Sequence, residues 1–307
     1  MLLYKQLRAM VPSVSHSRAS LLSTSSSFIR IARPLSSSSI ERDTGPVGVA
    51  RAIAAATNPE ISTSQATSTL FTRELALTDR VAFVTGANRG LGLEMAMAMM
   101  TESDGKQRRF HYVQGDVRDQ ANMWEIAREI GNKEGRFDVG VAAAGIEKGG
   151  IPATQFPEGS FRDVIDVNLN GVLYSAQAAG QQMERFANGG SIILIASICG
   201  HIAVKPIYQV AYHSAKSGVL QMARTMACEL GSQNIRVNSI SPGFINTTMI
   251  EEVYRVPELL QYVESLNPLG RIGRPDELRG VATWLASDAS SFCTGSDINV
   301  SGGSTAW

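Results

Sequence analysis

Apolar runs and helical patterns alternate along the chain from residue 80 to residue 300. The runs are short and rich in β-branched and aromatic residues, as in RVAFVT at 80–85, which is typical of buried strands. Such strands between helices predict a single α/β domain, with a parallel sheet covered by helices on both faces. The expected strands are 80–85, 110–116, 137–145, 191–197, 235–241 and 296–300, and the expected helices are 91–100, 121–131, 161–186, 211–231 and 275–287.

Three glycines mark the turn between the first of these strands and the helix after it. Gly86, Gly90 and Gly92 stand in the run TGANRGLG at 85–92. Glycine lets the backbone turn tightly and approach a phosphate closely, and a helix N-terminus attracts negative charge. Because ligands of doubly wound sheets bind beyond the carboxyl ends of the strands, the turn predicts a dinucleotide site. Taken alone, it is equally typical of a purely structural turn.

The first 40 residues differ in composition from the rest of the chain. They hold five basic residues, twelve serines and no acidic residue. This composition predicts a disordered mitochondrial transit peptide over 1–40, with processing near Arg33. The alternative is a disordered tail without an address, in a cytoplasmic protein. A linker is expected over 41–74, and the folded domain over 75–307.

Charge and composition exclude several classes of function. The net charge is zero, which gives no indication of nucleic-acid binding. No run of eighteen apolar residues occurs, so no membrane span is expected. The three cysteines are far apart, which favours reduced thiols over disulfides, and the four histidines lack the spacing of metal ligands. We therefore expect no metal site.

A tyrosine and a lysine four residues apart indicate acid–base chemistry. Tyr212 and Lys216 share one face of the expected helix 211–231. A neighbouring cation stabilises phenolate, so we expect Lys216 to lower the pKa of Tyr212. Ser197 ends an expected strand fifteen residues earlier, where its hydroxyl could meet the same substrate oxygen. Asn168 lies within an expected helix, which indicates either an exposed residue or one that holds a water molecule behind Lys216.

Seven motifs in a fixed order resemble the short-chain dehydrogenase/reductase family, over about residues 77–307. Among its members, the chain looks most similar to fungal reductases of ketoses and polyols. The resemblance implies a Rossmann-like doubly wound sheet and a homodimer or homotetramer. The motifs are TGANRGLG (85–92), GDV (115–117), AAAG (142–145), VNLNG (167–171), Ser197, Tyr212 with Lys216, and SPGFINT (241–247).

The resemblance also implies a role for each matching residue. Hydride would pass between the nicotinamide and a carbonyl carbon, with Tyr212 as the proton donor or acceptor. Lys216 would bind the nicotinamide ribose, Ser197 would orient the substrate, and Asn168 would complete a proton relay through water. Thr247 would hold the carboxamide. The implied cofactor-binding residues are Gly86, Asn88, Arg89, Gly90, Leu91, Gly92, Asp116, Val117, Ala144, Gly145, Tyr212, Lys216, Pro242, Gly243 and Thr247.

The chain departs from the family between the glycine turn and the GDV motif. Gly92 and Asp116 are only 24 residues apart, about half of the family's spacing. The shortfall would remove the second strand and its following helix, which carry the residue that selects the cofactor. We expect residues 110–116 to occupy the vacant position and to pair with residues 80–85, because an unpaired gap would be costly.

The shortening leaves the choice of cofactor to other residues. Arg89, Arg108 and Arg109 could meet a 2′-phosphate, which favours NADP(H), although NAD(H) is possible and solvated surface charge is the alternative for these arginines. Asp116 could instead bind the ribose, at the spacing of a ribose-binding acid. In the family it meets the adenine.

These observations predict an NADP(H)-dependent oxidoreductase that acts on a small ketone or secondary alcohol, such as a ketose or polyol. One alternative is a 3-oxoacyl-thioester reductase. The acidic and apolar composition of the segment 249–266 favours a small substrate over a large acyl carrier. An alternative of another class is a cofactor-impaired, non-catalytic subunit or isoform with the same fold.

Overall fold

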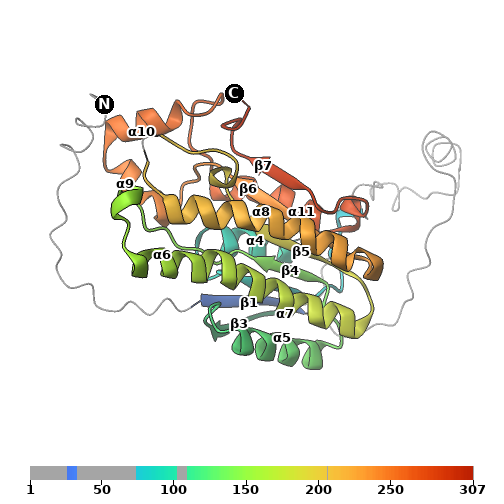
Figure 1. Cartoon of the computed structure of the whole chain (residues 1–307). Coiled ribbons are helices and arrows are strands. Elements are labelled where there is room, and N and C mark those ends of the chain that lie inside the picture. Colours follow the sequence, from blue (N-terminus) through green and yellow to red (C-terminus); the bar gives the residue numbers. More distant parts are fainter. Residues whose placement is uncertain (1–25, 33–73, 102–108, 206, 307) are drawn as a thin grey trace, which may run out of the picture.

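The computed structural model describes residues 26–32, 74–101, 109–205 and 207–306. They form a seven-stranded sheet with helices on both faces, which confirms the predicted Rossmann-like α/β fold (Figure 1). Five neighbouring strands, β2 and β4 to β7, run parallel. In spatial order the strands are β3 (Arg109–Gly115), β1 (Ser26–Ala32), β2 (Ala82–Thr85), β4 (Val139–Ala142), β5 (Gly190–Ile195), β6 (Ile235–Pro242) and β7 (Asp297–Val300).

Two layers of helices enclose this sheet. In Figure 1, α5, α6, α7 and α8 lie in front of the strands, and α4 and α11 lie behind them. The helices are α4 (Gly90–Thr101), α5 (Gln120–Glu134), α6 (Glu158–Ile165), α7 (Gly171–Phe186), α8 (Val210–Leu230), α9 (Glu251–Tyr254), α10 (Pro257–Glu264) and α11 (Arg279–Ala286). A π-helical turn, η2 (Asp166–Asn170), joins α6 to α7, and the short 3₁₀ helices are η1 (Ala153–Gln155), η3 (Ile198–Gly200), η4 (Gly231–Gln233), η5 (Thr248–Ile250), η6 (Pro275–Leu278) and η7 (Asp288–Ser290).

Alternation along the central strands divides the core into two halves. In β5, Ile192 and Leu194 pack into the cluster with residues of α5, α7 and α8, whereas Ile193 and Ile195 join the cluster with residues of α4 and α11. Successive side chains of a strand point to opposite faces. Because both faces are covered, the four residues 192–195 of β5 are all apolar, as the sequence predicts.

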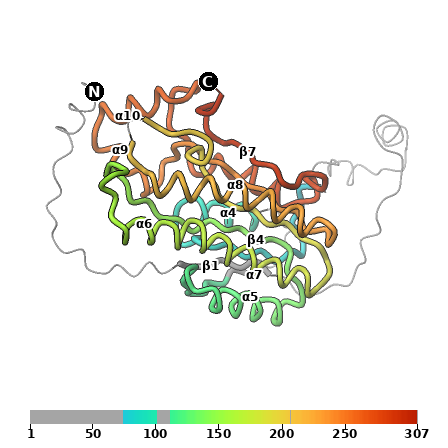
Figure 2. Tube along the Cα trace, viewed as in Figure 1, coloured from blue at the N-terminus to red at the C-terminus, as the bar shows by residue number. Residues whose placement is uncertain are grey.

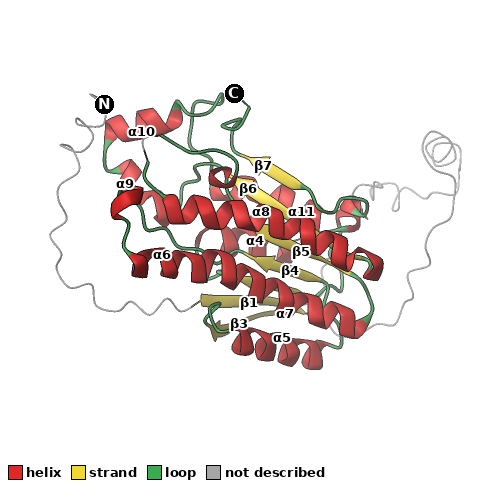
Figure 3. Ribbon diagram, in the orientation of Figure 1, coloured by secondary structure: helices red, strands yellow, loops and turns green. Residues whose placement is uncertain are grey.

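The strand β1 occupies the position that the short segment leaves vacant. It lies between β2 and β3 and is antiparallel to both, so that Ile29 is opposite Val84 on one side and Tyr112 on the other (Figure 3). The expected direct pairing of residues 110–116 with 80–85 is therefore wrong. An extended strand offers N–H and C=O groups on both sides, so β1 provides partners for both neighbouring edges.

The predicted boundaries around β1 also change. Disorder was expected throughout residues 1–40, but residues 26–32 form a strand. The rest of that range and the expected linker at 41–73 lie outside the described residues. The pattern FIRIA was the available signal, because it contains the β-branched and aromatic residues typical of strands.

The loss of the family's second strand and helix is confirmed. Between α4 and β3 the chain has only residues 102–108, too few for both elements. On β3, Val113 packs against the cluster with α5, while Tyr112 on the opposite face remains 57% exposed. The missing helix therefore leaves an aromatic side chain open to solvent.

Other elements agree with their predicted ranges or differ in detail. The expected helix at 161–186 is divided into α6, η2 and α7. The expected strand at 137–145 is shorter, and the segment after Thr247, where no element was predicted, forms η5, α9 and α10. Within the described residues, no helix is long and apolar enough to cross a membrane.

Substitution of Ile29 by proline should destabilise the protein, because proline has no N–H group to donate within the sheet. One unmade buried hydrogen bond costs about 1–3 kcal/mol, which lowers the unfolding temperature of a domain of this size by roughly 2–10 °C. Thermal unfolding of Ile29→Pro should show this loss. Ile29→Val, which keeps the N–H, is the matched control. Equal unfolding temperatures for the two variants would contradict the placement of β1.

Candidate active site

One cavity of about 630 Å³ lies at the carboxyl ends of the parallel strands. All of the cofactor-binding residues implied by the motifs line it, and so do three of the four expected catalytic residues, Ser197, Tyr212 and Lys216. The starts of α6 and α8 and the helices α9 and α10 lie on this side of the sheet, on the left in Figure 2. The fold thus joins motifs that are more than 150 positions apart in the sequence.

The glycine turn forms one wall of the cavity. Gly86 has a φ of +69°, and a Cβ there would lie 2.7 Å from the backbone of Ala144. A Cβ at Gly92 would lie 2.5 Å from the carbonyl oxygen of Gly86. Side chains at these positions would block the close packing of the turn, and α4 begins here with its N-terminus at the cavity. The wall therefore fits the pyrophosphate of a dinucleotide.

Thr85 fastens this turn to the end of β4. Its hydroxyl accepts hydrogen bonds from the N–H groups of Ala143 and Ala144, at 3.2 and 3.4 Å. The small side chains of Ala143 and Ala144 leave space beside the cofactor wall, and both residues line the cavity. The hydrogen bonds from these two N–H groups to Thr85 thus anchor the AAAG segment at 142–145, which has no side-chain amides.

Helix α8 places Tyr212 and Lys216 one turn apart at the cavity. The Lys216 side chain is buried, and its Nζ donates a hydrogen bond to the carbonyl oxygen of Ile195 at 2.7 Å. The same Nζ lies 5.6 Å from the centre of the Tyr212 ring. Ser197 follows β5, and its hydroxyl interacts with Tyr212 and accepts from the N–H of Cys199 at 3.2 Å. Ser197 and Tyr212, expected at the reacting oxygen, and Lys216, expected at the ribose, therefore lie together at this cavity.

The electrostatics of this group differ from expectation. Burial raises the pKa of Tyr212, and the neighbouring Cys199 thiol adds to this effect, while the hydrogen bond with Ser197 opposes it. Burial also lowers the pKa of Lys216 to about 8. The expected lowering of the Tyr212 pKa by Lys216 is wrong for the protein alone. The reason is that desolvation dominates and the ammonium is directed at the carbonyl of Ile195.

Asn168 has a different role from the other three residues. It is fully buried in η2, and its side chain donates to the carbonyl of Ile146 at 2.7 Å and accepts from the same residue's N–H at 2.8 Å. It is therefore not an exposed helix residue, and it does not line the cavity. The π-helical turn, a feature frequent at functional sites, directs the amide at the segment after Gly145.

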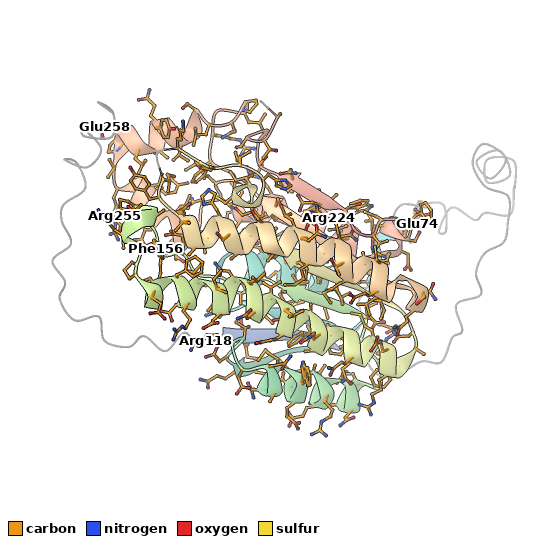
Figure 4. All side chains as sticks on the ribbon, viewed as in Figure 1. Glu74, Arg118, Phe156, Arg224, Arg255 and Glu258 are labelled. Atoms are coloured by element: carbon orange, nitrogen blue, oxygen red, sulfur yellow. The ribbon has the colours of Figure 1, made fainter. Side chains whose placement is uncertain are left out.

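Two arginines lie at or near the part of the cavity formed by Arg89 and Asp116. The side chain of Arg118 binds the Asp116 carboxylate at 2.9 Å, and this hydrogen bond lowers the pKa of Asp116. Arg118 was not predicted as part of the site; it lies near β1 and β3 in Figure 4. Arg89 is exposed and lines the cavity. Arg109 is the first residue of β3, and its contact with the cofactor stays a prediction. Arg108 lies outside the described residues.

Other residues of the cavity were missed by the sequence motifs. Glu147 follows the AAAG motif, and residues 248–251 form part of the wall beside Thr247. Residues 248–250 form η5 and Glu251 begins α9, and both elements are too short to show a clear period. Glu147 lies outside all of the motifs. Among the described residues, no group of His, Cys, Asp or Glu could hold a metal ion.

The buried ammonium of Lys216 should make stability depend on pH. The ordinary pKa of 10.5 applies to the unfolded chain, while burial lowers it to about 8 in the fold. Between these pH values the unfolded state retains a proton that the folded state has released, so stability rises with pH. The free energy of unfolding of the wild type relative to Lys216→Met should rise by about 3 kcal/mol from pH 8 to pH 10.5. A difference that is independent of pH in denaturant titrations would contradict this.

Known proteins share both the sequence and the fold. A family model described as enoyl-(acyl carrier protein) reductase matches residues 75–305. Sorbose reductase of Schizosaccharomyces pombe is 35% identical, with 76% of this chain and 98% of the relative covered. The 3-oxoacyl-(acyl-carrier-protein) reductase of Thermotoga maritima is 33% identical, with 75% and 99% covered.

The solved structures agree with these relatives. A gluconate 5-dehydrogenase from Burkholderia cenocepacia, in complex with NADP and tartrate, is 26% identical and superposes with a TM-score of 0.71. The alignment covers 77% of this chain and 99% of that one. The named relatives are oxidoreductases of alcohol and ketone groups, and the fold, the glycine turn and the Tyr212–Lys216 pair are of the kind that the motifs imply. The chain therefore belongs to the short-chain dehydrogenase/reductase family.

Proposed function

We propose that the protein is an NADP(H)-dependent reductase or dehydrogenase of a small ketose or polyol. The observation that carries this proposal is that one cavity holds both the glycine turn and the side chains of Ser197, Tyr212 and Lys216. The sorbose reductase and gluconate dehydrogenase named above support a sugar-related substrate. The complete set of side chains favours catalysis over a non-catalytic subunit.

The side chains suit proton transfer to a carbonyl oxygen. Because its pKa is raised, Tyr212 is a neutral phenol at pH 7 and can donate its proton during reduction. Ser197 interacts with this phenol and can donate a second hydrogen bond to the same oxygen. Lys216 is mostly charged at pH 7, and it stabilises negative charge that develops on Tyr212.

The cofactor wall would position the second reactant. A bound nicotinamide supplies or accepts the hydride. The glycine turn and the start of α4 would hold its pyrophosphate, and Lys216 would contact the ribose. Thr247 faces the turn, since a Cβ at Gly90 would lie 3.7 Å from Thr247 Cγ2. From this place Thr247 would hold the carboxamide and determine which face of the ring reacts.

The charge at the adenosine end favours NADP(H). Arg89 lines the cavity, and the nearby acid Asp116 is already bound by Arg118. The strand β1 stands where the family's second strand would end, and its sequence SSFIRIA contains no acidic residue that could bind a ribose diol. A 2′-phosphate would therefore meet net positive charge.

The rim of the cavity favours a small substrate over an acyl carrier. Arg255 directly follows α9, and it forms ion pairs with Glu251 and Glu252 of that helix. Glu258 on α10 adds a further negative charge close by (Figure 4). Acidic carrier proteins are attracted by free basic residues at an entrance, and the arginine beside α9 is already paired.

The primary experiment is a screen with NADPH of ketoses and of a 3-oxoacyl thioester. We expect turnover with ketoses, and Tyr212→Phe should lower it by about 10²–10⁴-fold, since a general acid is lost. Binding of NADPH, measured by fluorescence, should persist in this variant. Tyr254→Phe, outside the cavity, is the matched control. Wild-type protein that fails to bind millimolar NADPH would contradict catalysis, and preference for the thioester would favour the 3-oxoacyl reductase.

Arg89→Ala should change the choice of cofactor. Removing a charged hydrogen-bond donor to the 2′-phosphate should raise KM for NADPH by about tenfold and leave KM for NADH unchanged. Steady-state kinetics with both cofactors provide the measurement. Arg128→Ala, an exposed arginine on α5 paired with Glu125, serves as the control. An equal change for both cofactors would refute a role for Arg89 in selectivity.

We further propose mitochondrial import directed by basic residues before β1, and a homodimer or homotetramer. The motivating observations are the acid-poor N-terminal composition and the membership of the family. Fractionation of cells that express the full chain tests the first proposal. Light scattering on the purified protein tests the second, and a monomer would refute it.

A further inference from the structure

The carboxyl group of Glu147 has an unsatisfied oxygen at the catalytic end of the cavity. Its Oε1 is buried and has no hydrogen-bond partner, while the side chain of Gln209 hydrogen-bonds to the carboxyl group. Glu147 lines the same cavity as Tyr212, and its charge contributes to raising the pKa of Tyr212 and of Cys199. The carboxyl group therefore lines the catalytic cavity and interacts electrostatically with Tyr212 and Cys199.

An unsatisfied buried oxygen is costly for the protein alone. The cost is about 1–3 kcal/mol for a neutral group and more for a charged one. The neighbouring His213 does not remove it, since its Nδ1 lies 2.9 Å from the carbonyl of Gln209 and its Nε2 accepts from the N–H of Val204. Burial raises the pKa of Glu147. Nothing in its described surroundings completes its hydrogen bonds.

The backbone on both sides of Glu147 holds the carboxyl group in this place. Asn168 fastens Ile146, and the N–H of Gly150 donates to the carbonyl of Tyr208 at 2.9 Å. A Cβ at Gly149 would lie 2.3 Å from Oε1 of Glu147, so a larger residue there would displace the carboxyl. The backbone of Glu147 is therefore fixed at the cavity wall, and rotation of its side chain would bring the free oxygen, which is buried beside Gly149, to the cavity.

We infer that Glu147 is a substrate-specificity residue that accepts hydrogen bonds from hydroxyl groups next to the reacting carbon of a neutral, polyhydroxylated substrate. This inference rests on the proposed function and names its substrate class. An ionised carboxylate only accepts hydrogen bonds, and O–H donors satisfy it best. A substrate that carries its own carboxylate would meet like charge in a site of low dielectric. Glu147 thus favours ketoses and polyols over sugar acids.

Glu147→Gln tests this inference, because it keeps the size of the side chain and removes its charge. The variant and the wild type are assayed with a neutral ketohexose and with a keto-hexonate of equal chain length. In the variant, KM for the ketohexose should rise about tenfold while kcat stays within about threefold. The preference in kcat/KM for the neutral sugar over the acid should fall by at least tenfold.

Two further variants separate a specificity role from a structural one. Glu147→Asp keeps the charge at a shorter reach, so it should retain discrimination against the keto acid. Glu125→Gln removes an equal charge from the surface of α5, where Glu125 is paired with Arg128, and should leave the preference unchanged. Without substrate, Glu147→Gln should unfold at a higher temperature than the wild type, since a buried charge is lost.

The possible outcomes distinguish this inference from the proposed function. Wild type that reduces the ketohexose, together with unchanged KM and preference in Glu147→Gln, would overturn the role of Glu147 alone. Wild type that prefers the keto acid would overturn it as well. Wild type that binds NADPH but reduces neither compound would overturn both this inference and the proposed function.

Discussion

A buried ammonium bonded to a strand carbonyl determines the arrangement of the catalytic end. Lys216 reaches from α8 to Ile195 at the end of β5, and this contact fixes the helix against the sheet. Tyr212 lies one turn earlier on α8 and is thereby held at the cavity. Ser197, the second residue after β5, lines the same cavity. Burying the Lys216 ammonium destabilises the folded protein, because the charge loses its hydration. Such a cost is typical of residues whose position serves ligand binding and not stability.

Much of this architecture could be predicted from the sequence. The strands at the centre of the sheet are short, apolar and covered on both faces, so their periodicity is unambiguous, as in β5. The residues of the cavity follow such strands directly, and the carboxyl ends of parallel strands meet at one edge. For this reason the positions of Gly86, Ser197 and Thr247 could be inferred from local patterns.

Other features depend on partners that are distant in the sequence. The placement of β1 follows from two unpaired strand edges, and no local pattern near Ser26 contains that information. The pKa of Tyr212 depends on burial, which opposes the effect of the nearby lysine. Whether the Glu147 carboxyl finds hydrogen-bond partners depends on how the segment before α8, with Gln209, packs against it. Each of these features arises from packing and not from periodicity.

The strand β1 constrains how the chain can mature. Cleavage near Arg33, where the basic and serine-rich composition suggests processing, would separate β1 from the domain and expose the edges of β2 and β3. A leader that is compatible with the folded enzyme must therefore end before Ser26. It can then still include Lys5, Arg8 and Arg18. One short N-terminal stretch would thus contain a disposable address followed directly by a permanent part of the catalytic domain.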